Sequence, residues 1–347
     1  MVYILTSIPP SLPKDNTSKR GGITDVEAKH YSNNTTYFNI SVLYQHAFLV
    51  EPDLFLYEHD QSVVIFVQSS HLNTARRELI RTTWANGSYY KKNRRPYVFF
   101  VSGLETRCHC VRETVRLEMS VRKDILLLAI NDSYDNLTIK GLLTMAWIEN
   151  KLNASVKFVI KTDDDVILNT FRWLSILSIQ MSSRHSPFII GYVWQRPAVQ
   201  RTGRYAVSSK EYREDYYPAF CTGSGYAMSR NAVAVMLEMT SNVPFLKRDD
   251  PFITGLLAAE GHISRYTFNR MTYVLYPADF KTVRSWQRTM LVHGANSSIW
   301  HDVWNTYVLS SQTKSYDIPE MAVTFVTSEW FPKEVRKDPI KRNRNLR

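Results

Sequence analysis

The sequence has few of the residues that would assign it at once to a compartment or to a special structural class. Its three cysteines are Cys108, Cys110 and Cys221, and because only two of them can pair, their number leaves both the disulfide and the redox compartment open. Cys108 and Cys110 are too close for the usual zinc pairs, which have two to four intervening residues. Glycine and proline are not enriched, with 12 and 14 in 347 residues, which excludes collagen-like and low-complexity chains.

Long hydrophobic runs are also absent near the beginning of the sequence. Residues 1–5 are apolar, but Pro9, Pro10 and Pro13 follow at once, so no signal peptide or membrane anchor is evident there. Two explanations stay open: a native N-terminus before Met1, or another route to the compartment in which the protein acts. The chain is 44% hydrophobic, which is enough for one large core or two small ones.

The net charge of +11 is compatible with binding to nucleic acid, to an acidic membrane surface or to a phosphorylated ligand. Part of this charge lies in the basic tail at 331–347, which we expect to be solvated. No zinc-finger spacing and no RNP-like aromatic motif accompanies the charge, so the sequence gives a nucleic-acid partner little support.

Asparagine followed by x-Ser/Thr is unusually frequent. About three such sites are expected by chance, and nine are present. This excess favours a glycoprotein of the secretory pathway, with biased local composition as the alternative. The sites are Asn16, Asn33, Asn34, Asn39, Asn86, Asn131, Asn136, Asn153 and Asn296.

The pattern along the chain predicts one α/β domain. Residues 1–58 lack periodicity and are interpreted as a poorly ordered stem or linker. From there to about residue 330, short apolar runs alternate with helical segments, which favours a sheet with parallel strands whose ligands bind beyond the carboxyl ends of the strands. Strands are predicted at 63–67, 97–101, 125–130 and 156–161, and helices at 74–84, 105–121 and 137–152.

An acidic triplet follows the last of these predicted strands. If strand geometry persists, Asp163 and Asp165 project to the same side and form an oxygen site for Mn²⁺ or Mg²⁺. Such an ion would bridge the diphosphate oxygens of a nucleotide. The alternatives are an exposed acidic turn or a helix N-cap, since a helical stretch begins at Asn169.

Four further segments contain candidate site residues. Arg77, Arg81 and Trp84 share one helical face that suits a nucleotide diphosphate, unless Trp84 belongs to the core. Gly223 and Gly225 permit close backbone approach to a ligand, although a plain turn explains them as well. Asp250 precedes Pro251 and is either a helix N-cap or a general base for a hydroxyl group. His293 is either structural or a further metal ligand.

These motifs, in this order, resemble the β-1,3-glycosyltransferase family that contains β-1,3-galactosyltransferases and β-1,3-N-acetylglucosaminyltransferases, with Fringe as a more distant relative. The resemblance runs from about Val63 to Trp304. Six blocks carry it: 76–84, 132–140, 161–166, 217–229, 249–255 and 291–293. One departure is Pro251, which stands where the family usually has valine and changes the backbone around Asp250.

The resemblance implies a GT-A-type catalytic domain over 59–330, with a mixed, mostly parallel sheet flanked by helices. It also implies an inverting hexosyltransferase that uses Mn²⁺ and a UDP-sugar to extend a glycan on a glycoprotein or glycolipid, as a type II membrane protein of the Golgi lumen. An inactive, glycan-binding family member is the alternative. The donor stays open among UDP-galactose, UDP-N-acetylglucosamine and UDP-N-acetylgalactosamine.

The family's site residues are transferred to this sequence position by position. Asp250, with Asp249, is expected at the catalytic base. The remaining expectations are Arg77, Arg81, Trp84, Lys161, Asp163 and Asp164 for the donor; Asp163, Asp165 and His293 for the metal; and Tyr217, Gly223, Gly225 and Tyr226 for an acceptor or structural loop.

Overall fold

The structure is a computed structural model, and it describes residues 40–54, 61–91, 94–105, 107–108, 110–178, 185–268, 289–294, 297–305 and 324–326. The strands are β1 Phe48–Val50, β2 Val63–Gln68, β3 Tyr97–Leu104, β4 Ile125–Asn131, β5 Phe158–Asp163, β6 Val166–Leu168, β7 Phe188–Trp194, β8 Phe220–Ser229, β9 Ser264–Thr267, β10 Leu291–His293 and β11 Thr324–Val326. The α-helices are α1 Ile40–Tyr44, α2 Thr74–Thr82, α3 Glu113–Arg122, α4 Leu137–Lys151, α5 Thr170–Ile176, α6 Arg230–Glu238, α7 Ala258–Glu260 and α9 Ser297–Val303. Residues Gly87–Tyr89 (η2), Tyr134–Asn136 (η4) and Met239–Ser241 (η6) form 3₁₀ turns, and Pro251–Leu257 (η7) is a π-helix.

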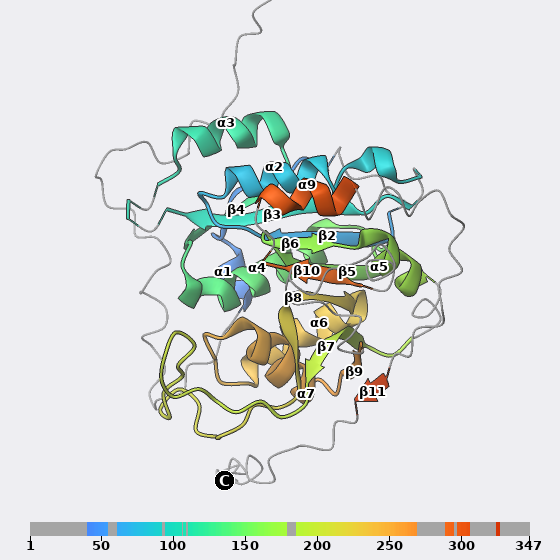
Figure 1. Ribbon diagram of the computed structural model, residues 1–347. Coiled ribbons are helices and arrows are strands. Elements are labelled where there is room, and N and C mark those ends of the chain that lie inside the picture. The colour runs from blue at the N-terminus through green and yellow to red at the C-terminus, as the bar shows by residue number, and fades with distance from the viewer. Residues whose placement is uncertain are drawn as a thin grey trace, which may run out of the picture.

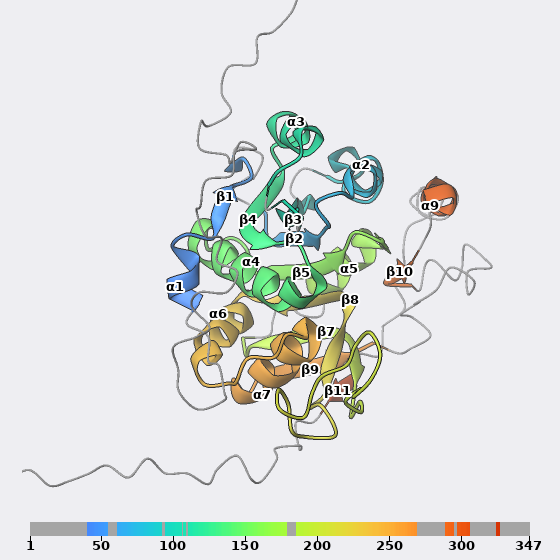
Figure 2. The same cartoon turned by 90° about the vertical axis from the view of Figure 1, so that its left-hand side faces the viewer.

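One mixed sheet organises the molecule, with the strand order β1-β4-β3-β2-β5-β8-β7-β9-β11. Strands β4, β3, β2 and β5 are parallel neighbours, whereas β8 is antiparallel to both β5 and β7. Helices α2, α3 and α9 cover one face of the sheet, and α1, α4 and α6 cover the other (Figures 1 and 2). The predicted α/β fold with a mixed, mostly parallel sheet is therefore confirmed.

The sequence of β2 explains its central place. All six residues of the run Val-Val-Ile-Phe-Val-Gln are buried, as expected for a strand that is covered on both faces. Val63, Ile65 and Val67 belong to the core on one side, and Val64 and Phe66 to the core on the other. This alternation follows from the two-residue repeat of a strand.

The predicted boundary between stem and domain at residue 59 is too late. Strand β1 pairs antiparallel with β4, and Ala47 beside it is fully buried. The folded domain therefore includes α1 and β1, which lie inside the segment interpreted as a stem. Residues 1–39 of that predicted stem, the tail at 331–347, and the sequons at Asn16, Asn33, Asn34, Asn39 and Asn296 lie outside the described residues.

The cysteines account for a second difference from the sequence prediction. Cys108 and Cys110 form a disulfide, and Cys221 is free and buried. Glu105 and Cys110 form an isolated antiparallel bridge, so the chain turns back on itself where a helix over 105–121 was predicted. The helix begins instead at Glu113, after this turn has ended.

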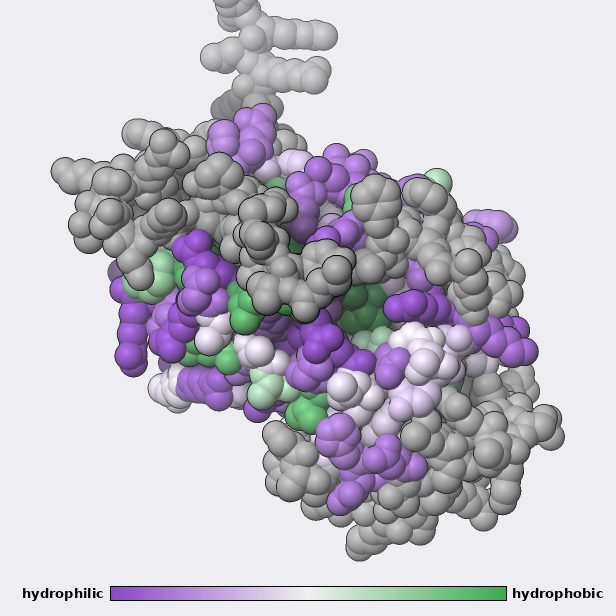
Figure 3. All heavy atoms as spheres, turned by 90° about the horizontal axis from the view of Figure 1, so that it is seen from above, coloured by the Kyte–Doolittle hydropathy of each residue, from purple (hydrophilic) through white to green (hydrophobic). Residues whose placement is uncertain are grey.

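The surface seen from above is mainly hydrophilic where the structure describes it, with small, separate hydrophobic areas (Figure 3). Among the helices of the described residues, none is both long enough and apolar enough to pass through a bilayer.

Candidate active site

The acidic triplet lies where two central parallel strands end. Asp163 is the last residue of β5 and is in register with Gln68, the last residue of β2. Asp164 and Asp165 form the turn that follows, and β6 begins at Val166. The N-cap interpretation of the triplet is wrong, because the Asn169 side chain accepts a hydrogen bond from Arg172 N and caps the next helix.

A two-stranded ribbon brings the C-terminal part of the chain to this turn. Strand β10 pairs antiparallel with β6, so that His293 is opposite Val166. The backbone N–H of Gly294 donates to the carbonyl oxygen of Asp165 at 3.0 Å. As a result, His293 Nε2 lies 3.4 Å from Asp165 Oδ1.

The residues at this turn fit a divalent cation in part. A separation of 3.4 Å between an imidazole nitrogen and a carboxylate oxygen allows both atoms to ligate one ion, since each bond is about 2.0–2.2 Å long. Asp163, the third predicted ligand, faces Lys161, and its oxygens do not converge with those of Asp165 and His293 within 4.8 Å. The structure thus brings two of the three predicted metal ligands together.

A single group of three potential ligand side chains converges among the described residues, namely Glu105, Cys108 and Cys110. Its two cysteines are joined in a disulfide, and a metal requires thiolates. This group therefore does not compete with the acidic turn as a metal site.

The protonation of Asp165 and His293 is coupled. The hydrogen bond to Asp165 raises the pKa of His293, and burial only partly opposes it. Burial acts against ionisation of Asp165, but the hydrogen bond and charge of His293, together with Arg76, outweigh burial and lower its pKa. The two groups therefore stabilise each other's charged forms.

Lys161 links the two acidic segments of the site. Its side chain is buried, and Nζ donates to Asp163 Oδ1 at 2.8 Å and to the carbonyl oxygen of Gly223 at 2.6 Å. It also lies 3.9 Å from Asp249 Oδ2. Burial alone would lower the pKa of this lysine, but the surrounding carboxylates outweigh burial and raise it. Lys161 is therefore a fixed cation that holds β5, β8 and the Asp249–Asp250 segment together.

Asp250 occupies a pocket that Gly223 creates. A Cβ atom at residue 223 would overlap both carboxylate oxygens of Asp250. The carboxylate accepts a hydrogen bond from the Gly223 backbone N–H. Its Oδ1 is buried and has no hydrogen-bond partner among the described residues, and the side chain makes no capping hydrogen bond to η7. Asp250 therefore stands at the N-cap position, with Pro251 at the start of the helix as predicted, but its side chain does not cap the helix.

Burial, and next the negative charge of Asp249, raise the pKa of Asp250 well above its usual range, while Lys161 and the Gly223 N–H oppose the shift. A buried carboxylate with a raised pKa is a stronger proton acceptor than an exposed one. The geometry and the electrostatics therefore both suit a general base.

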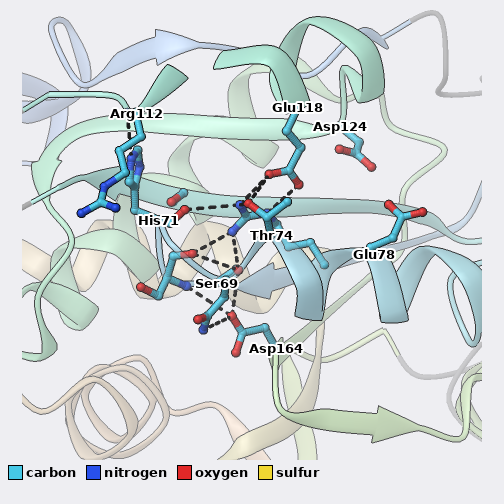
Figure 4. Close-up of polar contacts among 12 residues, drawn as sticks. Ser69, His71, Thr74, Glu78, Arg112, Glu118, Asp124 and Asp164 are labelled. Atoms are coloured by element: carbon cyan, nitrogen blue, oxygen red, sulfur yellow. Dashed lines mark hydrogen bonds and ion pairs between the residues drawn. The ribbon is translucent and has the colours of Figure 1, made fainter. Parts of the chain in front are cut away.

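Arg77, Arg81 and Trp84 have other roles than the predicted contact with a nucleotide. Arg77 is fully buried and donates to Glu118, Ser69 and Thr74 as well as to backbone oxygens. Figure 4 shows Glu118 and Thr74 at the top of this network, and Ser69 and Asp164 at its lower end. The apolar face that the two arginines share with Ile80 explains the error, because that face points into the core.

Arg81 and Trp84, the other two residues of this face, also contact protein groups. Arg81 pairs with Glu118 at 2.8 Å and with Asp124 at 2.8 Å. Trp84 is fully buried, and its Nε1–H donates to the carbonyl oxygen of Val166 at 3.0 Å. Trp84 therefore supports the acidic turn from inside the core.

Arg76 is the arginine of α2 that the sequence interpretation missed. Its guanidinium lies 3.1 Å from Asp164 Oδ1 and 3.8 Å from Asp165 Oδ2, and the side chain is 44% exposed. Asp164 itself is buried and accepts hydrogen bonds from Ser69 and Asn73, so it positions the start of α2. The helical repeat could have indicated this role, since Arg76 is one residue away from the apolar face of α2 and so does not point into the core.

The block 132–140 holds the strand ends together. Lys140 and Asp132 form a buried ion pair at 2.8 Å, and Lys140 Nζ also donates to the carbonyl oxygen of Ser69. Asp132 in turn accepts from the backbone N–H of His71. These contacts connect the ends of β4 and β2 with α4.

Three of the four residues predicted for an acceptor or structural loop have structural roles. Tyr217 is buried and stacks on Tyr212, with ring centroids 5.1 Å apart. Tyr226 is buried opposite Lys161 in the sheet. A Cβ atom at Gly225 would meet the Leu291 side chain at 2.5 Å, so this glycine allows the ribbon to pack on β8.

Comparison with known proteins agrees with this arrangement. The profile of the family described as galactosyltransferase matches residues 75–269, a span that includes α2, the acidic turn, Gly223 and Asp250. The chain belongs to the galactosyltransferase family. It is a glycosyltransferase by membership of this family, which confirms the resemblance seen in the sequence.

Two members of the galactosyltransferase family show how similar this sequence is to its relatives. The chain is 30% identical to beta-1,3-galactosyltransferase 5 of Mus musculus over 213 residues, which are 61% of this chain and 68% of the relative. It is 23% identical to beta-1,3-galactosyltransferase 1 of Mus musculus over 244 residues, which are 70% and 73% of the two chains.

Among solved structures, mouse xyloside xylosyltransferase 1 aligns with 69% of this chain and 98% of its own, at 10% identity and a TM-score of 0.35. A glycosyltransferase involved in the glycosylation of the major capsid of PBCV-1 aligns with 70% of this chain and 99% of its own, at 10% identity and a TM-score of 0.34.

Proposed function

We propose that this protein transfers a hexose or N-acetylhexosamine from a UDP-sugar to a hydroxyl group of a glycan, with inversion and formation of a β-1,3 linkage. One observation carries the proposal: Lys161 joins Asp163, at the end of β5 beside Asp165 and His293, to the segment of Asp249 and Asp250. A cation site and a candidate base thereby share one site. The similarity to two β-1,3-galactosyltransferases supports the linkage.

Asp165 and His293 would hold a divalent cation, with Mn²⁺ preferred because the pair offers one oxygen and one nitrogen. A bound Mn²⁺ or Mg²⁺ supplies positive charge to the diphosphate of the leaving UDP. Asp163 lies next to this pair and keeps Lys161 in place. Arg76 is more exposed than Arg77 and Arg81 and adds a positive charge beside Asp165. A diphosphate bound to the cation would lie near this charge.

Asp250 is the proposed general base. Its buried Oδ1 has no hydrogen-bond partner in the described part of the chain and accepts the proton of the acceptor hydroxyl. The hydroxyl oxygen then forms a bond to the anomeric carbon, while the bond from that carbon to the β-phosphate oxygen breaks and UDP leaves with the electron pair. A single displacement from the opposite side inverts the configuration.

The test is an assay of the purified protein with UDP-galactose, UDP-N-acetylglucosamine and UDP-N-acetylgalactosamine, each with and without EDTA and with Mn²⁺ restored. We expect sugar transfer with one donor, loss of transfer in EDTA and recovery with Mn²⁺. Glycan binding without turnover of any donor would instead identify an inactive, glycan-binding protein. Transfer that is unchanged by EDTA would contradict the proposed cation site.

We also propose that the protein acts in the Golgi lumen as a type II membrane protein, on a glycoprotein or glycolipid acceptor. The nine sequons support this location. Asn153, an exposed residue in the turn after α4, is one of them. Endoglycosidase H and peptide N-glycosidase F digestion of the expressed protein tests the assignment: an unchanged electrophoretic mobility after both treatments argues against passage through the secretory pathway.

A further inference from the structure

Two arginines and two tyrosines form a cluster beside the candidate base. This arginine–tyrosine cluster consists of Tyr134, Arg204, Tyr205 and Arg248. The guanidinium carbons of Arg204 and Arg248 lie 5.1 Å and 5.0 Å from the centre of the Tyr134 ring. The rings of Tyr134 and Tyr205 are 5.9 Å apart, and the two tyrosines are 41% and 47% exposed.

The four residues come from three separate segments. Tyr134 begins the turn after β4, Arg204 and Tyr205 lie in the long connection from β7 to β8, and Arg248 precedes η7. This connection loops beside α7 in both views of the ribbon (Figures 1 and 2). The fold thus assembles an exposed aromatic and cationic surface that no single segment contains.

The two arginines of the cluster are not held in ion pairs. Neither Arg204 nor Arg248 forms an ion pair with a residue that the structure describes, whereas the neighbouring Lys247 lies 3.8 Å from Asp135. Arg248 Nη2 donates to the carbonyl oxygen of Arg204 at 3.2 Å, but Nε and Nη1 of Arg248 are buried and have no partner among the described residues. Buried N–H donors without a partner are costly, so a ligand that accepts from them is stabilised.

The cluster adjoins the proposed base. Arg248 is two residues from Asp250 in the chain, and the charges of Asp249 and Asp250 reach the Tyr134 hydroxyl, whose pKa is raised by burial first and then by Tyr205 and these carboxylates. The proposed cation site, with Arg76, lies at the other acidic segment. A ligand on the cluster is therefore next to the base that activates the acceptor.

We infer that the arginine–tyrosine cluster is an acceptor subsite that prefers a sugar with an anionic group, either a carboxylate or a sulfate. The exposed parts of the two tyrosine rings provide apolar contact for the C–H groups of a sugar ring, and the guanidinium groups bind the anion through their N–H donors. This inference rests on the proposed glycosyl transfer and specifies its acceptor class.

The experiment compares pairs of acceptors in which one member has an anionic group in place of a neutral one. Transfer is measured to p-nitrophenyl β-glucuronide and β-glucoside, and to 6-sulfated and unsulfated p-nitrophenyl β-N-acetylglucosaminide. For the wild-type protein we expect a lower KM for the charged member of at least one pair, and the pair concerned distinguishes a carboxylate from a sulfate. Arg204→Ala and Arg248→Ala should reduce the charged-to-neutral ratio of kcat/KM about tenfold, and Arg204→Lys should retain part of it.

Arg213→Ala is the matched control, because Arg213 is an exposed arginine of the same β7–β8 connection and its removal changes the net charge equally. The ratio should be unchanged in this variant. An equal ratio for wild type and Arg204→Ala, or an effect of Arg204→Ala on the KM of the UDP-sugar alone, would overturn the inference.

A measurement of glycoside binding in the absence of transfer tests this inference independently of the proposed function. The same four glycosides are titrated into the Asp250→Asn protein with UDP and Mn²⁺ present, and affinity is measured by calorimetry or ligand-observed NMR. Preferential binding of a charged glycoside that depends on Arg204 supports the subsite even if no transfer occurs with the wild-type protein. Equal affinity for charged and neutral glycosides overturns the subsite even if transfer is active.

Discussion

Gly223 and Asp250 form a matched pair, since the space that a side chain at residue 223 would fill is taken by the carboxylate of Asp250. The same glycine contributes its N–H to this carboxylate and its carbonyl oxygen to Lys161. One backbone unit therefore positions both the proposed base and the buried cation. The Gly-x-Gly pattern thus reflects the approach of an acidic side chain as much as that of a ligand.

Gly223→Ala should reduce kcat by about 100-fold or more, because the added methyl group displaces the Asp250 carboxylate and a small displacement of a reacting group has a cost of this size. Steady-state kinetics with the UDP-sugar and acceptor measures the effect. Gly87→Ala is the control, since its methyl group meets only the side chain of the exposed Arg95, which can move away. Equal activity of the two variants would contradict the proposed role of Gly223.

Asp250→Asn should lower kcat by about 10²- to 10⁴-fold, the usual contribution of a general base, with UDP binding retained. Because the pKa of Asp250 is raised by burial and by Asp249, the wild-type rate should fall as the pH decreases, and this fall should begin above the range of an ordinary carboxyl group. A pH–rate profile of kcat checks this. Full activity of Asp250→Asn would exclude Asp250 as the base.

His293 should make cation binding depend on pH. Its pKa is raised by the hydrogen bond to Asp165, and only the neutral imidazole ligates a metal. Mn²⁺ affinity should therefore weaken as the pH falls through a value above 6.5 and strengthen as it rises. Titration of Mn²⁺, followed by its electron paramagnetic resonance signal, measures this at pH 6 to 8.5. His293→Gln should weaken binding about 10- to 100-fold and flatten the pH dependence; an unchanged affinity would remove His293 from the site.

The adjacent residues Arg76 and Arg77 should differ in what their loss affects. Arg77→Met leaves Glu118 buried without its main partner, so the free energy of unfolding should fall by about 3–5 kcal/mol. Arg76→Ala removes a partly exposed ion pair and should change it by less than about 1 kcal/mol, while the KM of the donor rises. Urea denaturation and donor kinetics on both variants test the contrast, and a strongly destabilised Arg76→Ala protein would argue against it.

The sequence predicted the sheet well because its central strands are short, continuous apolar runs with turns between them. Residue type and position made Asp165, His293 and Asp250 candidates with other interpretations open, and only the order of the motifs in a family pattern joined them in one site. Neither the antiparallel pairing of β10 with β6 nor the pocket at Gly223 follows from local spacing, since both depend on contacts between distant segments.

The arginines of α2 show where local reasoning failed. Arg77 and Arg81 share a helical face with Ile80 and Trp84, and both guanidinium groups are neutralised in the interior by Glu118 and Asp124. A sequence pattern gives the face of a helix but not the partner of a charged side chain. The start predicted for α3 failed for a related reason, because a covalent link between Cys108 and Cys110 lies in the segment expected to be helical.

The β6–β10 ribbon has a consequence for the order in which the protein is made. During translation Asp165 leaves the ribosome well before His293, so a nascent chain already has the acidic turn but not the imidazole that completes it. At the proposed cation site, full affinity would therefore require that the late strand has docked. A cation bound at this proposed site would stabilise finished molecules over interrupted ones, and a chain cut before β10 would lose this advantage.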